Sequence, residues 1–111
     1  MEAIVIFTNL PDHDSAQRLA MQLITGKIAA CVNIMAPCVS TYRWQGAIES
    51  TTEVPVLIKT RRCHYNAAEQ IIRSCHPYAV PEIIAIPVVA GLADYLGWIR
   101  TETADSPECS D

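Results

Sequence analysis

The chain has 111 residues, of which 50% are apolar, and a formal net charge of −4, which predicts one domain with a hydrophobic core. Its eight Lys and Arg do not cluster beyond Arg61-Arg62, which argues against a nucleic-acid partner because phosphate binding needs a basic surface. No apolar run approaches a membrane span, and residues 1–9 lack the basic start of a signal peptide, so we expect a cytoplasmic protein with no membrane partner.

The first two predicted elements are a strand and a helix. Residues 3–8 are a short run rich in β-branched and aromatic side chains, which predicts a buried strand. Apolar residues then recur at helical spacing from Ala16 to Ile24, and Gly26 lies close to the expected C-terminal stop. This pattern predicts an amphipathic helix that covers one face of a sheet.

Two long extended stretches follow. Residues 29–35 predict a second strand, which Pro37 interrupts and residues 39–44 continue. Gln45-Gly46 is a tight-turn signal, and residues 47–60 form a third strand. Each stretch could reach about 14 residues, whereas strands usually have about 5–6.

The last third of the chain predicts helix, strand and helix. Apolar spacing from Ala68 to Cys75 indicates a second main helix, which Pro77 ends. Residues 82–89 predict a fourth strand, and residues 92–99 a last helix. We therefore expect one domain over residues 1–102 and a polar, frayed C-terminal tail over residues 103–111.

The element order is β-α-β-β-α-β followed by an extra C-terminal helix, with a long hairpin between the second and third strands. That order predicts an α+β, ferredoxin-like sandwich with strand order 4-1-3-2 and both main helices on one face. The far end of the hairpin carries Val39, Tyr42, Trp44 and Ile48, which one small domain cannot cover. We expect these strands to pair with another subunit in a closed oligomer, with Tyr42 and Trp44 as interface anchors.

The cysteines do not form a recognisable framework. There are five, an odd number, and no Cys-x-x-Cys pair, so we expect neither a disulfide framework nor a structural zinc site. Cys31 and Cys38 lie in apolar runs and fit buried hydrophobes. Cys63 and Cys75 flank a helix and are more reachable, and Cys109 lies in the polar tail.

The segment from His76 to Glu82 contains two prolines, which stiffen the connector between the second main helix and the fourth strand. Cys75 and His76 bring two metal-capable side chains to its start. Thiolates suit Cu(I) and imidazole suits Cu(II), so a copper site is one interpretation. A helix stop followed by a strand start would explain both prolines equally well.

Several motifs together closely resemble the CutA family of divalent-cation tolerance proteins, in order from about residue 4 to residue 100. They are residues 29–34 (AACVNI), residues 40–49 (STYRWQGAIE), Glu53, residues 58–60 (IKT), residues 76–78 (HPY), residues 81–84 (PEII), Gly91 and residues 95–99. The resemblance implies a homotrimer of ferredoxin-like subunits joined through the long strands, related in architecture to PII signalling proteins. It also implies a link to copper tolerance and copper binding, with no established reaction.

This chain departs twice from a copper-ligand pattern that some family members carry. Phe7 stands where they have a cysteine in the first strand, and phenylalanine cannot bind a metal. Cys75 stands in place of the first histidine of a His-His pair, so only His76 matches. Cys75 retains the capacity to bind metal but favours softer ions.

We expect the first and third strands to run parallel, so that four strand ends share one sheet edge near the subunit boundary. That edge would collect Thr8, Asn9, Cys31, Lys59, Cys75, His76, Tyr78 and Glu82. The predicted metal ligands there are Cys75, His76 and Cys31. Lys59, Glu82 and Tyr78 would line a ligand cleft, although Lys59 and Glu82 could instead simply neutralise each other.

The function predicted from the sequence is a trimer for divalent metal tolerance that binds copper or another divalent cation at this edge. The alternative is a PII-like trimer that senses a small molecule and has no physiological metal. We predict no enzymatic activity, because the chain has no nucleophile elbow, phosphate loop or HExxH zinc motif.

Overall fold

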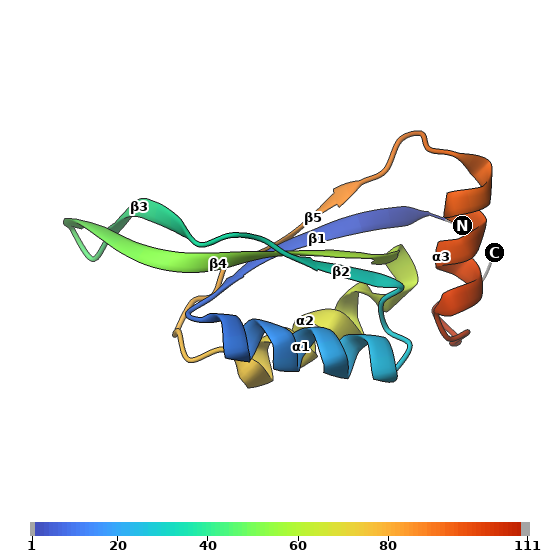
Figure 1. Ribbon diagram of the computed structural model, residues 1–111, viewed down its shortest axis with the longest axis horizontal. Coiled ribbons are helices and arrows are strands. Elements are labelled where there is room, and N and C mark those ends of the chain that lie inside the picture. Colours follow the sequence, from blue (N-terminus) through green and yellow to red (C-terminus); the bar gives the residue numbers. More distant parts are fainter. Residues whose placement is uncertain (1, 110–111) are drawn as a thin grey trace.

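The computed structural model describes residues 2–109 as a single sheet with helices against it (Figure 1). Its elements are β1 (Ala3–Leu10), α1 (His13–Thr25), β2 (Cys31–Ile34), β3 (Cys38–Trp44), β4 (Ala47–Arg61), the 3-10 turn η1 (Arg62–His64), α2 (Tyr65–Cys75), β5 (Ile83–Pro87) and α3 (Ala93–Glu102). None of the described helices is both long and apolar enough to cross a membrane.

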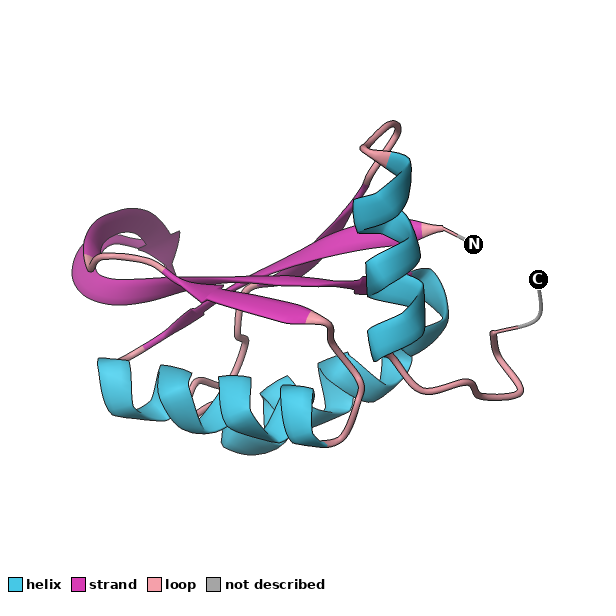
Figure 2. Ribbon diagram, turned by 45° about the vertical axis from the view of Figure 1, so that its right-hand side comes forward, coloured by secondary structure: helices cyan, strands magenta, loops and turns pink. Residues whose placement is uncertain are grey.

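The sheet has the strand order β2-β4-β1-β5, and β3 extends it by pairing with the first half of β4. Helices α1 and α2 lie side by side on one face, and α3 stands at the end of the sheet (Figure 2). This arrangement confirms the predicted ferredoxin-like fold, the strand order and the extra helix. The second predicted strand is two strands, β2 and β3, on either side of Pro37.

The core forms between the sheet and the two helices because alternate residues of β1 and β4 point toward them. Ile6 and Ile58 are paired in register and fully buried, whereas their neighbours in sequence face the opposite side. The helices supply the spaced apolar residues that the sequence predicts. The core residues include Ile4, Ile6, Leu10, Leu19, Leu23, Val54, Val56, Ile58, Ala68 and Ile72.

The predicted parallel relation of the first and third strands is wrong, because β1 and β4 are antiparallel, with Ala3 opposite Arg61 and Leu10 opposite Val54. The crossover through α1 makes β2 parallel to β1 and leaves a gap of one strand between them. β4 fills this gap after a tight turn reverses the chain. The end of β1 and the end of β4 therefore lie at opposite ends of the sheet.

The β3–β4 hairpin projects from the body and makes the molecule elongated, with extents of 45 × 26 × 24 Å. Its two-residue turn has positive φ at both positions, 49° at Gln45 and 84° at Gly46, which is the type I′ geometry that matches strand twist. Val39 and Ile48 on the hairpin are each 71% exposed. The arm is therefore well formed but uncovered within one chain.

The tail after α3 is tied to the body, contrary to the predicted fraying of residues 103–111, of which 110 and 111 lie outside the described residues. The amide of Ala104 donates to the carbonyl of Lys27 at 2.9 Å. Cys109 forms a disulfide with Cys63, with 4.9 Å between the Cα atoms. The sequence predicts no disulfide framework and did not indicate this single bond, because the bond depends on the return of the tail to η1 after α3.

Candidate functional site

A cleft of about 500 Å³ opens where the hairpin arm meets the end of β1 and the segment before β5. Its lining combines hairpin residues with residues of the proline-stiffened connector. They are Asn9, Ser40, Thr41, Tyr42, Trp44, Glu49, Glu53, Tyr78, Ala79, Val80 and Glu82. The cleft therefore joins two predicted cleft residues, Tyr78 and Glu82, to the two predicted interface anchors, Tyr42 and Trp44.

The cleft is acidic. Glu49, Glu53 and Glu82 contribute three carboxylates, and none of the described residues that line it is Lys or Arg. Glu53 is only 7% exposed, so its charge is screened little by water. The arrangement favours a cationic ligand over an anionic one.

Two tyrosines that line the cleft have raised pKa values. Burial raises the pKa of Tyr42, and the charges of Glu49 and Glu53 raise it further. Burial also raises the pKa of Tyr78, with a smaller contribution from Glu53. Both phenols are therefore protonated at neutral pH and present hydrogen-bond donors to the cleft.

Glu82 is held at the mouth of the cleft by the end of β1. The Nδ2 of Asn9 donates to Oε1 of Glu82 at 3.0 Å. Lys59 lies elsewhere in the sheet, opposite Cys31, and its Nζ is 6.0 Å from the centroid of the Tyr95 ring. Within one chain, Glu82 is thus partnered by Asn9 rather than by Lys59.

His76 already uses both ring nitrogens. Its Nδ1 accepts from the amide of Tyr78 at 3.3 Å, which assigns the proton to Nε2, and Nε2 donates to the carbonyl of Asn9 at 2.5 Å. The ring also packs against Tyr78 with 4.5 Å between centroids. A metal ion at His76 must displace one of these hydrogen bonds.

The predicted metal ligands lie in different surroundings. The Sγ of Cys75 donates to Oε1 of Gln22 on α1 at 3.6 Å. Cys31 begins β2 at the level of Lys59, whereas His76 contacts Asn9 near the other end of β1. The predicted shared edge of eight residues is therefore wrong, because antiparallel β1 and β4 divide it into two groups.

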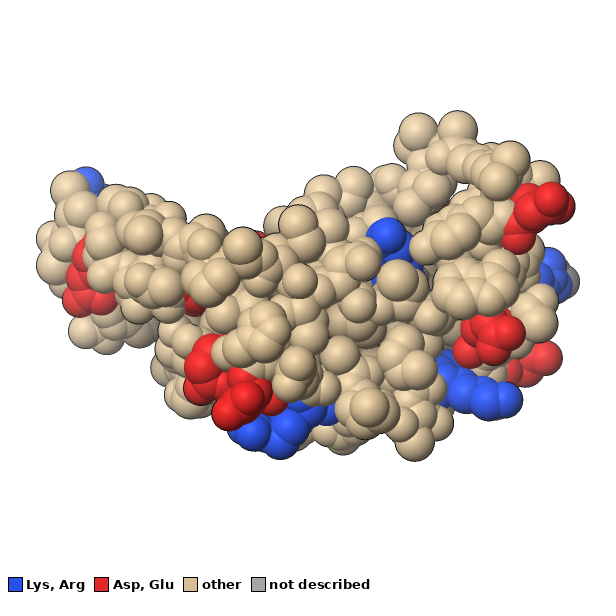
Figure 3. All heavy atoms as spheres, in the orientation of Figure 1, with Lys and Arg blue, Asp and Glu red and all other residues tan. Residues whose placement is uncertain are grey.

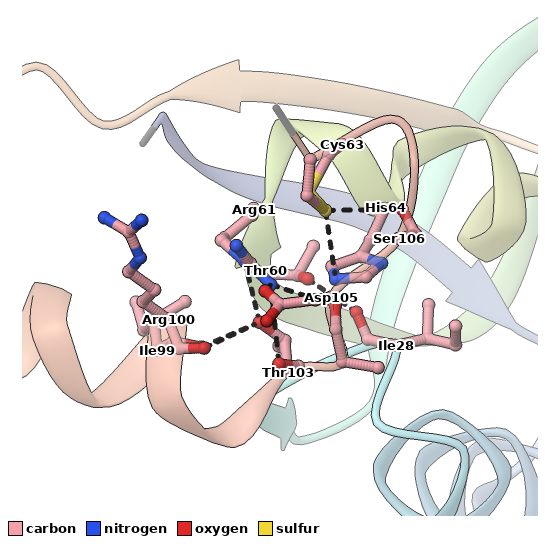
Figure 4. Close-up of a disulfide and its surroundings, with 12 residues drawn as sticks. Ile28, Thr60, Arg61, Cys63, His64, Ile99, Arg100, Thr103, Asp105 and Ser106 are labelled. Carbon is pink, nitrogen blue, oxygen red and sulfur yellow. Dashed lines mark hydrogen bonds and ion pairs between the residues drawn. A yellow bond between two sulfur atoms is a disulfide. The ribbon is translucent and has the colours of Figure 1, made fainter. Parts of the chain in front are cut away.

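A second group of metal-capable side chains was missed in the sequence, at Cys63, His64 and Cys109 (Figure 4). Their ligand atoms all lie within 4.8 Å of one another, the only such group of three or more among residues 2–109. The adjacent Cys63-His64 pair was a visible signal. Its partner could not be found from spacing, because Cys109 is 46 residues away.

His64 is buried, with an exposure of 3%, and charged groups of both signs act on its ring. Burial lowers the pKa of the imidazole, and the positive charge of Arg61 lowers it further. A hydrogen bond with the backbone of Ala104 and the charges of Asp105 and Glu108 act in the opposite direction. The net lowering favours the neutral imidazole.

Arg61 connects the end of β4 to the tail and is 1% exposed. Its Nε donates to Oγ1 of Thr103 at 2.9 Å, and its Nη2 donates to the carbonyl of Ala104 at 2.9 Å. Nη2 also forms an ion pair with Asp105 at 3.3 Å (Figure 4). The tail is thus fixed by a buried guanidinium as well as by the disulfide.

The fold and the acidic cleft together define a ferredoxin-like protein with a projecting hairpin and a site suited to cations. Residues 4–102 match the family described as CutA1 divalent ion tolerance protein. The chain therefore belongs to the CutA family, as the sequence motifs predict.

Relatives and solved structures agree with this assignment. The Thermus thermophilus protein named divalent-cation tolerance protein CutA is 38% identical over 93% of this chain and 99% of its own length. A rice protein named Protein CutA 1, chloroplastic, is 36% identical over 94% of this chain, which spans 59% of that relative's length. The crystal structure of CutA from Xylella fastidiosa has a TM-score of 0.89 at 45% identity, covering 94% of this chain and all of that chain. CutA1 from Oryza sativa has a TM-score of 0.92 at 36% identity, covering 96% and 97%.

Proposed function

We propose that this chain is a non-enzymatic, cation-binding protein of divalent-cation tolerance that holds its ion in the acidic cleft. The observation that carries the proposal is the convergence of Glu49, Glu53 and Glu82 without a basic residue in the lining. Carboxylate oxygens are ligands for hard and borderline divalent cations. The CutA family's description as divalent ion tolerance proteins agrees with this chemistry.

Copper is the cation that we propose first, with His76 as the residue of the predicted metal set best placed to assist. His76 adjoins the cleft through its contacts with Asn9 and Tyr78. Cu(II) favours imidazole together with oxygen ligands. Cys75 can bind the ion only if its thiol gives up the hydrogen bond to Gln22. Cys31 lies opposite Lys59, away from the cleft, so it can contribute only from another subunit or to a separate site.

We also propose that the working form is a homotrimer. The sheet face opposite α1 and α2 carries Val5, Phe7, Leu57, Ile84 and Ile86, and the last two are 52% and 47% exposed. In Figure 3 the surface between the hairpin arm and α3 is hollowed and carries few charged side chains. Association of three copies would cover this face together with Tyr42 and Trp44 on the arm.

Calorimetric titration with Cu(II), Zn²⁺ and Mg²⁺ tests the cleft. We expect the Glu53→Gln, Glu82→Gln double variant to bind Cu(II) at least tenfold more weakly than the unmodified protein. An Asp94→Asn, Glu102→Gln variant removes the same formal charge from α3, outside the cleft, and should bind normally. Equal affinity in all three proteins would overturn the cleft as the site.

A Cys75→Ser, His76→Ala variant separates the cleft from the ligands predicted by sequence. Loss of Cu(II) binding in this variant alone would place the ion at the connector. Native mass spectrometry on the same samples reports the number of subunits and of bound ions together. A folded monomer at micromolar concentration would contradict the trimer.

The alternative function, a PII-like sensor of a small molecule, is favoured by the aromatic part of the cleft. Tyr42, Trp44 and Tyr78 are each about 40% exposed there, and a hollow of about 500 Å³ has the size of a small-molecule site. A ligand mass that remains on a metal-free trimer in native mass spectrometry would favour this function.

The cytoplasmic location stays a prediction. Related proteins carry names that place them in other compartments, including a chloroplastic protein of rice and a protein of Archaeoglobus fulgidus titled periplasmic. The question matters for this chain because a disulfide persists mainly in oxidising compartments. Alkylation of free thiols in intact cells, followed by mass analysis, would report the state of the Cys63–Cys109 pair.

A further inference from the structure

The Cys63–His64–Cys109 group lies at the opposite end of β4 from the cleft, where η1 meets the tail. The Nε2 of His64 is 3.7 Å from the Sγ of Cys109. A tetrahedral zinc ion with ordinary bond lengths to nitrogen and sulfur separates two such ligand atoms by about 3.6 Å. The imidazole and one sulfur therefore already have the spacing of ligands that share an ion.

The surroundings of the group match those of a metal ligand set. His64 is 3% exposed, so the surrounding protein fixes the orientation of its ring, as it does for metal-ligating imidazoles. The hydroxyl of Ser106 donates to the Sγ of Cys109 at 3.4 Å. Asp105 pairs with Arg61, which offsets the positive charge closest to the group.

We propose that, when the disulfide is reduced, Cys63, His64 and Cys109 bind one soft or borderline d¹⁰ cation, Zn²⁺ or Cu⁺, with water as a fourth ligand. Two thiolates and an imidazole are the donor set that such ions prefer. Two sulfurs that share an ion lie farther apart than two sulfurs in a disulfide. Cys109 lies in the tail beyond α3, so we expect its sulfur to move by this short distance when the bond is reduced. The site is independent of the acidic cleft and of the function proposed for it.

The chemistry of opening the site balances with a small thiol as reductant. One small thiolate attacks a sulfur of the disulfide, which forms a mixed disulfide and releases one protein thiolate. A second small thiolate attacks the small-thiol sulfur of the mixed disulfide, which releases the other protein thiolate and joins the two small thiols as their own disulfide. The protein gains two electrons and two protons as two thiols. Binding of the cation then releases the two thiol protons to solvent. The disulfide is thus the closed, metal-free form, and the dithiol is the binding form.

Cobalt is the probe for the experiment, because Co²⁺ bound to thiolates has a strong charge-transfer absorption in the near ultraviolet. A Cys31→Ser, Cys38→Ser, Cys75→Ser background removes the other thiols and leaves only Cys63 and Cys109. The protein is reduced with dithiothreitol, desalted without oxygen and titrated with Co²⁺. We expect one Co²⁺ per chain with thiolate charge-transfer absorption, which Zn²⁺ abolishes by displacement.

Three comparisons decide the outcome. The oxidised protein and a Cys109→Ser variant of the same background should lack the absorption, and His64→Gln should weaken Co²⁺ binding at least tenfold. Circular dichroism on each sample establishes that the fold is retained, and Cys109→Ser alters only the tail. The proposal is overturned if the reduced background protein shows no thiolate absorption with Co²⁺. It is equally overturned if His64→Gln binds as tightly as the parent.

Discussion

Replacement of Arg61 by methionine should destabilise the protein strongly. Methionine retains much of the length of arginine but removes the buried guanidinium, which is the donor to Thr103 and Ala104. The two 2.9 Å bonds connect a charged donor to neutral acceptors, and such bonds contribute about 1.5–3 kcal/mol each. The ion pair with Asp105 adds little, because that side chain is 93% exposed.

The net loss is smaller than the sum of these bonds, because an apolar replacement no longer has to desolvate a charge. We therefore expect the free energy of unfolding to fall by about 3 kcal/mol, which is a large part of a typical total of about 5–15 kcal/mol. Urea denaturation followed by circular dichroism measures this change through the midpoint at constant slope.

The neighbouring residue provides the control. Arg62 has a side chain that is 73% exposed, and it pairs with the exposed Glu2 at 3.6 Å. Arg62→Met should change the free energy of unfolding by no more than about 0.5 kcal/mol. Equal effects of the two substitutions would refute the idea that the buried guanidinium fixes the tail to the sheet.

Three further outcomes follow from single contacts. Thr8→Val should raise the free energy of unfolding by about 1 kcal/mol, because Oγ1 of Thr8 is buried without a partner among the described residues; a decrease in urea denaturation would reveal a missed partner. Reduction of the Cys63–Cys109 bond should lower the free energy of unfolding by about 4 kcal/mol in urea denaturation, since the bond closes a loop of 46 residues. The stability of a Cys63→Ser, Cys109→Ser variant should not change with reductant. The backbone amide of Ser15 donates to the side chain of Asp12 and lowers the pKa of that carboxyl in the folded protein. The contribution of Asp12 to stability is therefore complete above its unfolded pKa of about 4, and it is lost as the pH falls through the lower folded pKa. Thermal melts from pH 7 to pH 2 should therefore depend less on pH in Asp12→Asn, and identical profiles would contradict this assignment.

Periodicity was sufficient to predict most of the fold. The spacing of Leu19 and Leu23 on α1 and of Ala68 and Ile72 on α2 indicates the buried faces that the structure has. Gln45-Gly46 correctly predicts the tight turn, because both positions need positive φ. Each of these patterns lies within one helix or one turn, so the sequence of that segment alone determines the structure it adopts.

The errors concern relations between distant segments. The antiparallel relation of β1 and β4 follows from the crossover through α1 and the reversal at the tight turn, and the wrong prediction overlooked this consequence of its own strand order. The relation separates Lys59 and Cys31 from Glu82. The disulfide depends on the return of the tail to η1, which a polar composition does not reveal. The acidic cleft likewise depends on the hairpin folding over the connector, so Glu49 and Glu53 carried no signal of their own as a site.

The central position of β1 has a consequence for the order of events during synthesis. β1 leaves the ribosome before the rest of the sheet, yet its two hydrogen-bonded neighbours are β4 and β5, which follow about forty and eighty residues later. Until β4 emerges, both edges of an apolar strand are open, and one edge remains open until β5 is made. The nascent chain therefore carries its most association-prone segment the longest, and a helper that shields extended apolar strands would act on residues 3–10.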